Sequence, residues 1–251
     1  MEPVDNLKQV RLDKLQKIEA SGVKPYPPFY AKKQTVLQCR NLLETEVKTA
    51  GRLMSFRSHG KVTFGDLIDE TGKIQLMIRK DEVGDDKFNF LELLDIGDFI
   101  GVSGRVMLTK TQEVTVKVAN LELLSKSLRP IPSQWYGFKD PEEKYRKRYL
   151  DLIINEKTKK TLDVRWLIER KIREFLWEKN FVEVETPILQ NLYGGTNAKP
   201  FTTHINALDQ EMYLRMAPEL YLKRLIVGGY ERVFEIARNF RNEGTDHQHQ
   251  P

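Results

Sequence analysis

The chain has little cysteine and no long apolar run. Its 251 residues include a single cysteine, Cys39, which excludes an intrachain disulfide and a metal site built from several thiolates. The first residues, MEPVDNLKQVRLDKLQ, lack the apolar core that a secretory signal needs. No apolar run approaches the roughly 18 residues that a membrane-spanning helix requires. These absences predict a cytoplasmic protein with no membrane partner.

Charge, in contrast, is abundant. Charged residues make up 31% of the chain and hydrophobic residues 40%, which is typical of a globular protein long enough for two modest domains. Lysine and arginine outnumber the acidic residues, and the formal net charge is +5. This mild basic excess favours a polyanionic partner such as nucleic acid, although an ordinary charged surface is equally consistent with it.

Residues 1–45 are predicted to form an N-terminal helical extension. Apolar residues recur with helical spacing over 6–21. The same segment carries three cations, Arg11, Lys14 and Lys17. They form either a solvated face or an arm that contacts phosphates.

Residues 46–126 are predicted to form an OB-fold barrel. Five strands separated by turn signals cover 47–57, 61–69, 73–79, 98–109 and 113–123. A helix is expected between the third and fourth strands, around 85–94. Five strands with a helix in this place are the element order of the OB-fold, which binds oligonucleotides on one face.

Four residues of the barrel are candidates for contact with nucleic acid: Arg57, Phe64, Gln75 and Glu113. Aromatic rings stack on bases, and polar side chains read base edges. A position in the core is the alternative for Phe64.

Residues 127–159 are predicted to be a linker followed by a basic helix. Two prolines stiffen the start of this segment, and Asp140 before Pro141 marks a helix N-terminus. The basic side of that helix is either solvated or in contact with an RNA backbone.

Residues 160–251 are predicted to begin a second domain that mixes helices and strands. Arg241 and Glu243 lie two apart after a strand-like stretch, so extended chain places them on one face. Arginine suits bidentate contact with a phosphate, and a surface ion pair is the alternative. Glu219 follows Pro218 at the start of a helix, where it either stabilises that terminus or receives an amino group.

Two other features of this domain are less specific. His247 and His249 lie two apart in a polar loop with no third ligand, so hydrogen-bonding or stacking roles are favoured over a metal site. Gly195 belongs to a glycine-rich loop that allows close approach of the backbone.

Several segments together resemble the class II aminoacyl-tRNA synthetases, and closely the lysyl-tRNA synthetases. They are RYLDLI (148–153), FVEVETPIL (181–189), GGTNAKPF (194–201), MYLRMAPELYLKRLIVGGYERVFEIARNFRNEG (212–244) and, in the barrel, GKVTFGDLIDETGKIQL (60–76). The resemblance implies an α+β architecture, in which the barrel precedes part of an antiparallel-sheet catalytic domain. It implies lysine–tRNA ligase activity, in which ATP activates lysine to lysyl-adenylate before transfer to tRNA-Lys.

The resemblance also implies roles for the barrel and for the dimer. The barrel would bind the anticodon, with Phe64 stacking on a base. Arg57, Gln75 and Glu113 would lie near a uridine-rich triplet. Motif 1 would end at Pro187 and build a homodimer interface.

For the substrates, the resemblance implies that Arg241 binds the α-phosphate of ATP. Glu243 would contact the adenine side, and His249 would lie near the nucleotide. Glu219 would receive the α-amino group of lysine, and Gly195 would contact that group through its backbone.

By the same resemblance, the chain holds motif 1 and the start of motif 2. The motif 3 arginine, the carboxylates that hold Mg²⁺ and the acidic reader of the lysine side chain follow in the family beyond residue 251. We therefore expect the 251 residues alone to show negligible activation. The alternatives are a tRNA-binding module without catalysis and an aspartyl or asparaginyl relative, against which APELYLK (217–223) argues.

Overall fold

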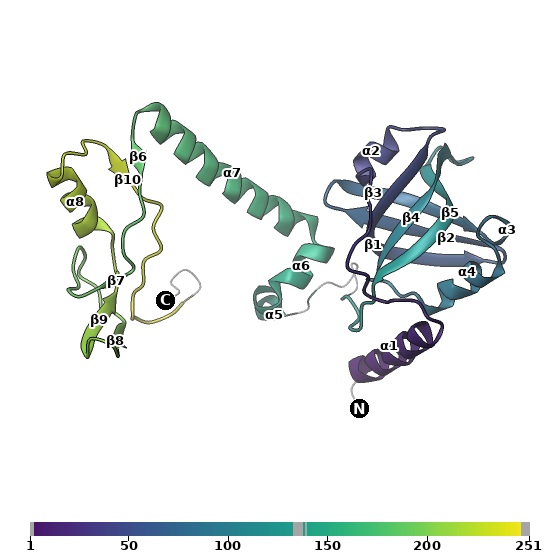
Figure 1. The fold of residues 1–251 in the computed structure, drawn as a ribbon, viewed down its shortest axis with the longest axis horizontal. Coiled ribbons are helices and arrows are strands. Elements are labelled where there is room, and N and C mark those ends of the chain that lie inside the picture. The colour runs from purple at the N-terminus through teal and green to yellow at the C-terminus, as the bar shows by residue number, and fades with distance from the viewer. Residues whose placement is uncertain (1–2, 133–137, 139, 247–251) are drawn as a thin grey trace. The chain divides into compact units, whose positions relative to one another are not determined.

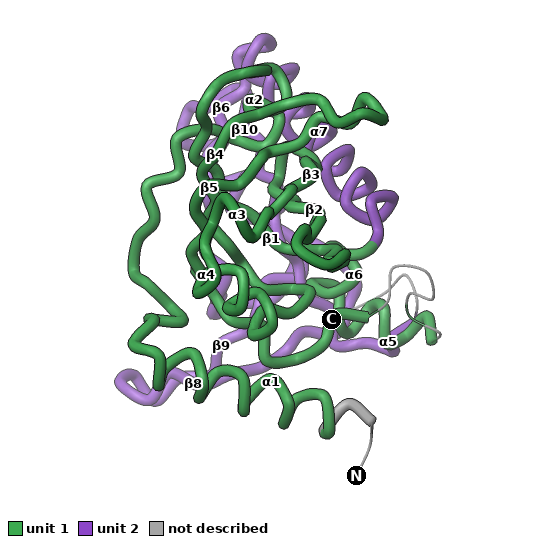
Figure 2. Tube along the Cα trace, turned by 90° about the vertical axis from the view of Figure 1, so that its right-hand side faces the viewer, with its two compact units in different colours: residues 1–154 green, residues 155–251 purple. Residues whose placement is uncertain are grey.

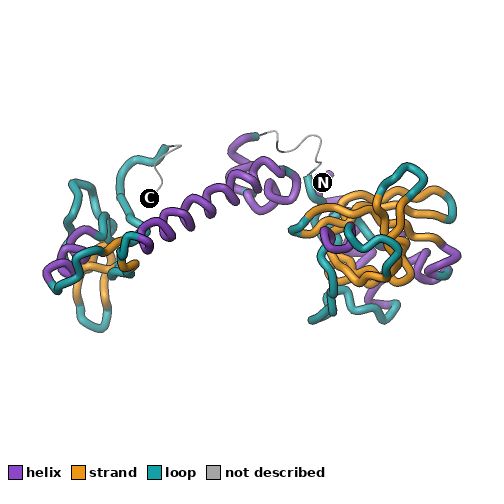
Figure 3. Tube along the Cα trace, turned by 90° about the horizontal axis from the view of Figure 1, so that it is seen from above, coloured by secondary structure: helices purple, strands orange, loops and turns teal. Residues whose placement is uncertain are grey.

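The computed structural model of the protein describes residues 3–132, 138 and 140–246. The chain divides into two compact units, unit 1 (Met1–Ile154) and unit 2 (Asn155–Pro251), which Figure 2 draws in green and purple. Unit 1 is dominated by long strands. Unit 2 combines one long helix with short strands and loops (Figure 3).

Unit 1 contains a closed five-stranded barrel (Figure 1). Its strands are β1 (Glu46–His59), β2 (Val62–Asp69), β3 (Gly72–Arg79), β4 (Phe99–Leu108) and β5 (Val114–Ser125). Neighbouring strands follow the order β1-β2-β3-β5-β4, and β4 closes onto β1. The β3–β5 pair is parallel and the other pairs are antiparallel.

Short helices follow β3, as the sequence predicts. They are α3 (Lys80–Val83), α4 (Asp85–Phe90) and the 3-10 turn η1 (Leu91–Leu93). Five strands in a closed barrel, with helices between the third and fourth, are the arrangement of an OB-fold. The predicted fold of this region is therefore confirmed.

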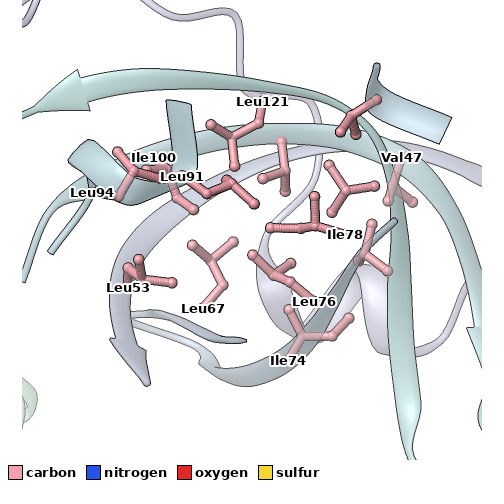
Figure 4. Packing of buried hydrophobic residues seen from close by; sticks show 14 of the residues in the cluster. Val47, Leu53, Leu67, Ile74, Leu76, Ile78, Leu91, Leu94, Ile100 and Leu121 are labelled. Atoms are coloured by element: carbon pink, nitrogen blue, oxygen red, sulfur yellow. The ribbon is translucent and has the colours of Figure 1, made fainter. Parts of the chain in front are cut away.

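The barrel core is built by alternation of side chains along the strands. In β3, Ile74, Leu76 and Ile78 are fully buried, while the residues between them face outward. Equivalent residues of all five strands meet in one hydrophobic cluster (Figure 4). Cys39 belongs to this cluster, and burial raises the pKa of its thiol. The single cysteine is therefore a small core residue.

Two glycines allow the barrel to close tightly. A Cβ on Gly104 would lie 2.0 Å from the backbone oxygen of Lys117, at a point where the β4–β5 register shifts. A Cβ on Gly51 would lie 2.5 Å from the backbone oxygen of Ile68 on β2. Neither backbone contact leaves room for a side chain, so glycine is required where strands are strongly bent.

The helix α1 (Pro3–Ala20) is held to the barrel by its cations. Arg11 Nη1 donates to the backbone oxygen of Ser127 at 2.9 Å, and Nη2 donates to that of Ile96 at 3.1 Å. Lys14 Nζ lies 2.8 Å from Asp95 Oδ1. Arg11 and Lys14 thus serve contacts within unit 1, a use that neither sequence interpretation of these cations included.

The helix α2 (Val36–Arg40) is attached to the end of β2 through one carboxylate. Asp69 Oδ2 accepts from Lys32 Nζ at 2.7 Å and from the backbone amide of Val36 at 2.9 Å. Its Oδ1 accepts from the amide and the hydroxyl of Thr71. Burial raises the pKa of Asp69, but these hydrogen bonds outweigh burial and lower it from 3.8 to about 2.

Unit 1 ends with two short helices, α5 (Pro141–Arg146) and α6 (Arg148–Ile154). Asp140 is the N-cap of α5 and accepts from the amide of Glu142 at 2.9 Å, with Pro141 at the first helical position. The helix start that the sequence predicts at this place is therefore confirmed.

Unit 2 begins with the long helix α7 (Glu156–Glu178). Its further elements are β6 (Val182–Glu183), β7 (Leu189–Gln190), β8 (Thr202–Ile205), β9 (Gln210–Leu214), α8 (Glu219–Val227) and β10 (Val233–Phe234). The strands form an antiparallel sheet in the order β7-β9-β8 and a parallel pair of β10 with β6. The strand-like stretch expected before Arg241 thus forms only the short strand β10 in the structure. Among the described residues, no helix is long and apolar enough to cross a membrane.

Candidate functional site

The outer face of the barrel brings together side chains from three neighbouring strands. Arg57 on β1 pairs with Phe64 on β2, which pairs in turn with Met77 on β3. In the adjacent row, Asp66 of β2 pairs with Gln75 of β3. Because side chains of paired residues point to the same face, Arg57, Phe64 and Gln75 share one surface.

This surface is hollowed. A depression of about 600 Å³ is lined by residues of β1, β2, β3 and the β4–β5 turn. Three of the four predicted nucleic-acid contacts, Arg57, Phe64 and Gln75, line it. Its other basic residues are His59, Arg79 and Lys110, although the Arg79 guanidinium is engaged by Asp81 at 2.7 Å.

Phe64 lies on the outer face of the barrel. Its neighbours in β2, Thr63 and Gly65, are buried, whereas Phe64 is only half-buried and is absent from the core cluster. The alternative interpretation, in which Phe64 is a core residue, therefore does not describe the structure. A half-exposed ring in a depression is available for stacking.

Gln75 and Glu113 are connected through Thr115 on β5. Thr115 Oγ1 donates to Gln75 Oε1 at 2.9 Å and lies 3.2 Å from the backbone oxygen of Glu113. The amide of Glu113 donates to Thr109 Oγ1 at 3.1 Å, and Thr109 lines the depression. Glu113 is therefore at the rim of the depression, one residue before β5 begins.

In unit 2, the glycine-rich loop lies against the start of α8. Gly195 has φ +86°, and a Cβ built on it would lie 3.3 Å from Glu219 Cβ and 3.7 Å from Glu219 Oε2. The two residues that the resemblance assigns to lysine are thus in contact. Glu219 is exposed at the first position of α8, and Lys223 Nζ lies 2.5 Å from its Oε1.

The segment that follows β10 runs beside the same glycine-rich stretch of the chain. The amide of Asn242 donates to the backbone oxygen of Lys199 at 2.8 Å, and the amide of Lys199 is 3.4 Å from Glu243 Oε1. Arg241 directly precedes Asn242 and is exposed. His249, predicted to lie near the nucleotide, falls outside the described residues, as do His247 and Gln250.

Arg215 is the residue of unit 2 that sequence reasoning missed. Only 5% of its side chain is exposed, and its Nη1 lies 2.6 Å from Glu235 Oε1 in a buried ion pair. Nη1 also donates to the backbone oxygen and the hydroxyl of Thr186, while Nε donates to the backbone oxygen of Arg238 at 2.9 Å. A lone arginine between apolar residues was the available signal.

Arg215 also acts through its own backbone. Its carbonyl oxygen accepts from the amide of Phe240 at 3.0 Å. One residue therefore joins the strand before Glu219 to the segment that carries Arg241, so both predicted substrate contacts depend on a common buried support.

Pro187, the predicted end of motif 1, is exposed between β6 and β7. The helix before it, α7, has a shallow apolar surface lined by Leu167, Ile168 and Ile172 together with Phe175. These side chains are between 46% and 58% exposed. An apolar surface of this kind is typical of an interface with another chain or domain. The homodimer contact through Pro187 stays a prediction.

The resemblance to a family implies Mg²⁺ as a cofactor. Over 3–132, 138 and 140–246, no group of three or more His, Cys, Asp or Glu side chains converges as metal ligands. These residues therefore hold no complete set of protein ligands for a metal ion.

Comparison with known families matches both units. Residues 47–124 match the OB-fold nucleic acid binding domain, and residues 140–251 match the class II tRNA synthetases of the D, K and N type. The chain therefore belongs to the class II tRNA synthetases, with an anticodon-binding type of barrel before the synthetase domain.

Similar curated proteins within this class are lysine–tRNA ligases. The chain is 49% identical over 250 residues to that of Methanoculleus marisnigri, a match that covers 96% of this chain and 49% of the relative. It is 48% identical to that of Carboxydothermus hydrogenoformans, with 99% of this chain and 52% of the relative covered. For Clostridium novyi the identity is 50%, with 96% and 48% covered. The chain spans about half the length of the curated relatives it matches.

Proposed function

We propose that this protein acts in the attachment of lysine to tRNA-Lys, with ATP as the source of energy. The observation that carries the proposal is the identity of 48–49% to lysine–tRNA ligases along nearly the whole chain. The contact between Gly195 and Glu219 supports it, because the two residues expected to hold the amino acid meet in the structure.

The barrel would bind the anticodon in the depression on its outer face. Phe64 would stack on a base, and Arg57 would contact the backbone or a base edge at the same face. Gln75 would read a base edge from the neighbouring row, with Glu113 at the rim. A flexible single strand suits this surface because its unstacked bases offer ring faces and edges together.

Unit 2 would bind ATP and lysine. Activation displaces pyrophosphate when the lysine carboxylate attacks the α-phosphorus, so the enzyme must hold the two reactants in line. The Arg241 guanidinium would bind the α-phosphate and offset the charge that develops there. Glu243 would contact the adenine side, with His249 near the nucleotide.

The amino acid would be held by Glu219, whose carboxylate would pair with the α-amino group of lysine. Gly195 would contact the same group through its backbone, since no side chain intervenes there. Mg²⁺ would assist the reaction by offsetting charge on the phosphates.

The homodimer is also part of the proposal. The apolar surface of α7 and the exposed Pro187 would be covered by a second copy of the chain. Exposed large apolar side chains on one helix face support this arrangement, because monomeric proteins rarely expose a contiguous apolar patch of this kind to water.

Lysine-dependent exchange of pyrophosphate into ATP would test the catalytic part. The assay needs residues 1–251 joined to the C-terminal half of a lysine–tRNA ligase relative. We expect exchange with lysine and not with aspartate or asparagine. This result would distinguish a lysyl-tRNA synthetase from an aspartyl- or asparaginyl-tRNA synthetase. Arg241→Ala should lower exchange by about a hundredfold or more, whereas Arg170→Ala, at an exposed position on α7, should leave it unchanged.

A tRNA-binding module without catalysis is the second candidate. It is favoured by the closed barrel, whose core is complete within unit 1. The 251-residue chain should then bind the tRNA-Lys anticodon stem-loop, with affinity that falls as salt rises, and show no exchange activity. Exchange activity in the 251-residue chain alone would exclude this reading.

A further inference from the structure

The side-chain amide of Gln75 is hydrogen-bonded to a buried hydroxyl. Thr115 is fully buried on β5, and its Cα is the direct partner of Gln75 across the parallel β3–β5 pair. Thr115 Oγ1 donates to Gln75 Oε1 at 2.9 Å. Because the hydroxyl is removed from water, solvent does not compete with the amide oxygen for its proton.

The two ends of a glutamine amide are chemically opposite. The oxygen accepts hydrogen bonds, and the nitrogen donates two. With Oε1 engaged by Thr115, the end that remains for a ligand is Nε2, since Gln75 lines the depression. Among the described residues, none accepts a hydrogen bond from Gln75 Nε2.

The neighbours of Gln75 do not compete for this nitrogen. Asp66, its cross-strand partner on β2, accepts from Ser55 Oγ at 2.8 Å through Oδ2 and lies 3.7 Å from Lys73 Nζ through Oδ1. The depression therefore presents a donor at this point, next to the ring of Phe64 in the adjacent row.

We propose that Thr115 is a positioning residue that makes Gln75 a donor, so that the depression selects a base with a carbonyl oxygen over one with an amino group. For pyrimidines this means that uracil O4 is accepted and cytosine N4 is rejected at the position read by Gln75. The inference rests on the proposed anticodon-binding function and concerns only how one base is distinguished.

A reversed amide is the structural alternative. Thr115 Oγ1 lies 3.2 Å from the backbone oxygen of Glu113, so it could donate there and accept from Gln75 Nε2 instead. Gln75 would then present Oε1 and prefer cytidine. The shorter contact to Gln75 Oε1 favours the first arrangement, and the two arrangements predict opposite base preferences.

The test uses the 251-residue chain and labelled anticodon stem-loops of tRNA-Lys. Each anticodon uridine is replaced in turn by cytidine or by pyrimidin-2-one ribonucleoside, which lacks O4. At one anticodon position, we expect the wild type to bind the uridine loop about three- to tenfold more tightly than either replacement. Gln75→Ala should lose this difference in affinity, and the position where it does so is the one that Gln75 reads.

Thr115→Val removes the hydroxyl and nearly keeps the shape. At that position, it should reduce the ratio of the affinity for uridine to the affinity for either replacement to about one. The affinity for the loop without O4 should stay unchanged. Thr115→Ser, which restores a hydroxyl, should restore most of the discrimination. Thr49→Val is the matched control, because Thr49 is equally buried in β1 but does not line the depression.

The ratio of the affinities for the uridine and cytidine loops distinguishes a positioning role of Thr115 from a general structural role. A loss of protein stability would weaken the binding of all stem-loops equally and leave this ratio unchanged. Thr115→Val with unchanged discrimination overturns the inference, and so does a wild-type preference for cytidine at the position that Gln75→Ala identifies. If the wild type binds none of the stem-loops, the proposed anticodon-binding function itself fails and the inference fails with it.

Discussion

The two units of this chain are stabilised in different ways. In unit 1, the strands close on themselves and enclose a continuous hydrophobic cluster to which α1 and α2 each contribute. In unit 2, Met216 is the one buried hydrophobic side chain among the described residues, while Trp166 and Phe175 of α7 are 59% and 58% exposed.

The difference shows what each unit needs from its surroundings. A barrel has no free edge and completes its own core, so unit 1 gains the hydrophobic effect without a partner. Unit 2 depends on the polar support around Arg215 and leaves a helix face for contacts outside the unit. The proposed binding surface of unit 1 is therefore preformed, whereas the proposed substrate contacts of unit 2 rest on one buried ion pair and the hydrogen bonds around it.

The largest expected effect breaks that ion pair. Arg215→Met removes the guanidinium and leaves the Glu235 carboxylate buried without its partner, a change that costs about 3–5 kcal/mol. We expect amides of β9 and of residues 235–242 to lose protection from hydrogen exchange, while barrel amides keep theirs.

Arg170→Ala is the matched control for this variant, because Arg170 is 76% exposed and pairs with Glu174 one helical turn away. An exposed pair of this kind contributes about 0.5 kcal/mol or less. Equal protection in the two variants would mean that unit 2 does not depend on Arg215.

The next largest effect concerns the affinity of the barrel for RNA. Phe64→Ala should weaken binding of the tRNA-Lys anticodon stem-loop by roughly 1–3 kcal/mol, because a base loses its stacking partner. Fluorescence anisotropy with the labelled stem-loop measures the change. Hydrogen exchange in unit 2 should not respond, since Phe64 belongs to the self-contained unit.

Phe99→Ala provides the comparison for Phe64. Phe99 is also a partly exposed aromatic residue of the barrel, but it packs under Arg52, with 4.3 Å between guanidinium and ring centroid, and does not line the depression. Equal losses of affinity in the two variants would assign the effect to the barrel as a whole and not to stacking.

The barrel could be predicted from sequence because its signals are local. Alternation in β2 and β3 and the turns between strands fix which side chains face inward, and Phe64 and Gln75 then fall on the same outer face. The Thr115 contact could not be found in this way, because β5 pairs with β3 through a register that the sequence does not encode locally.

Unit 2 was harder to predict for a physical reason. The contact of Gly195 with Glu219, and of Lys199 with Glu243, joins segments far apart in the chain. The resemblance to a family assigned Gly195 and Glu219 to one substrate, whereas no sequence signal indicated the contact of Lys199 with Glu243. Arginine is usually a surface residue, so the sequence did not indicate that Arg215 is buried. Its burial depends on partners distant in the chain, such as Glu235.

A further test concerns the acid stability of the barrel. The hydrogen bonds that lower the pKa of Asp69 to about 2 favour its ionised form in the folded barrel. A lowered carboxyl pKa stabilises the fold above the unfolded value of 3.8, and this stability is lost as pH falls toward 2. We expect the barrel to lose about 2 kcal/mol in this interval, measured by urea unfolding at each pH.

Asp69→Asn identifies the group responsible. The amide cannot ionise, so the variant should be less stable at neutral pH and should show a smaller loss between pH 4 and 2. Asp81→Asn is the control, because Asp81 pairs with Arg79 at an exposed position. An unchanged acid profile in Asp69→Asn would place the sensitivity of the barrel in other carboxylates.

The smallest expected effect concerns the N-terminal cap of α2 in unit 1. Thr35 Oγ1 accepts from the amide of Gln38 at 3.3 Å, and Gln38 Oε1 accepts from the amide of Thr35 at 2.8 Å. Thr35→Ala removes one of these two bonds and should cost about 1 kcal/mol, measured by urea unfolding of the barrel. Thr35→Ser should cost much less because it keeps the acceptor. A loss as large as that in Arg215→Met would contradict the comparison, since the barrel core, and not a single polar contact, is expected to hold unit 1 together.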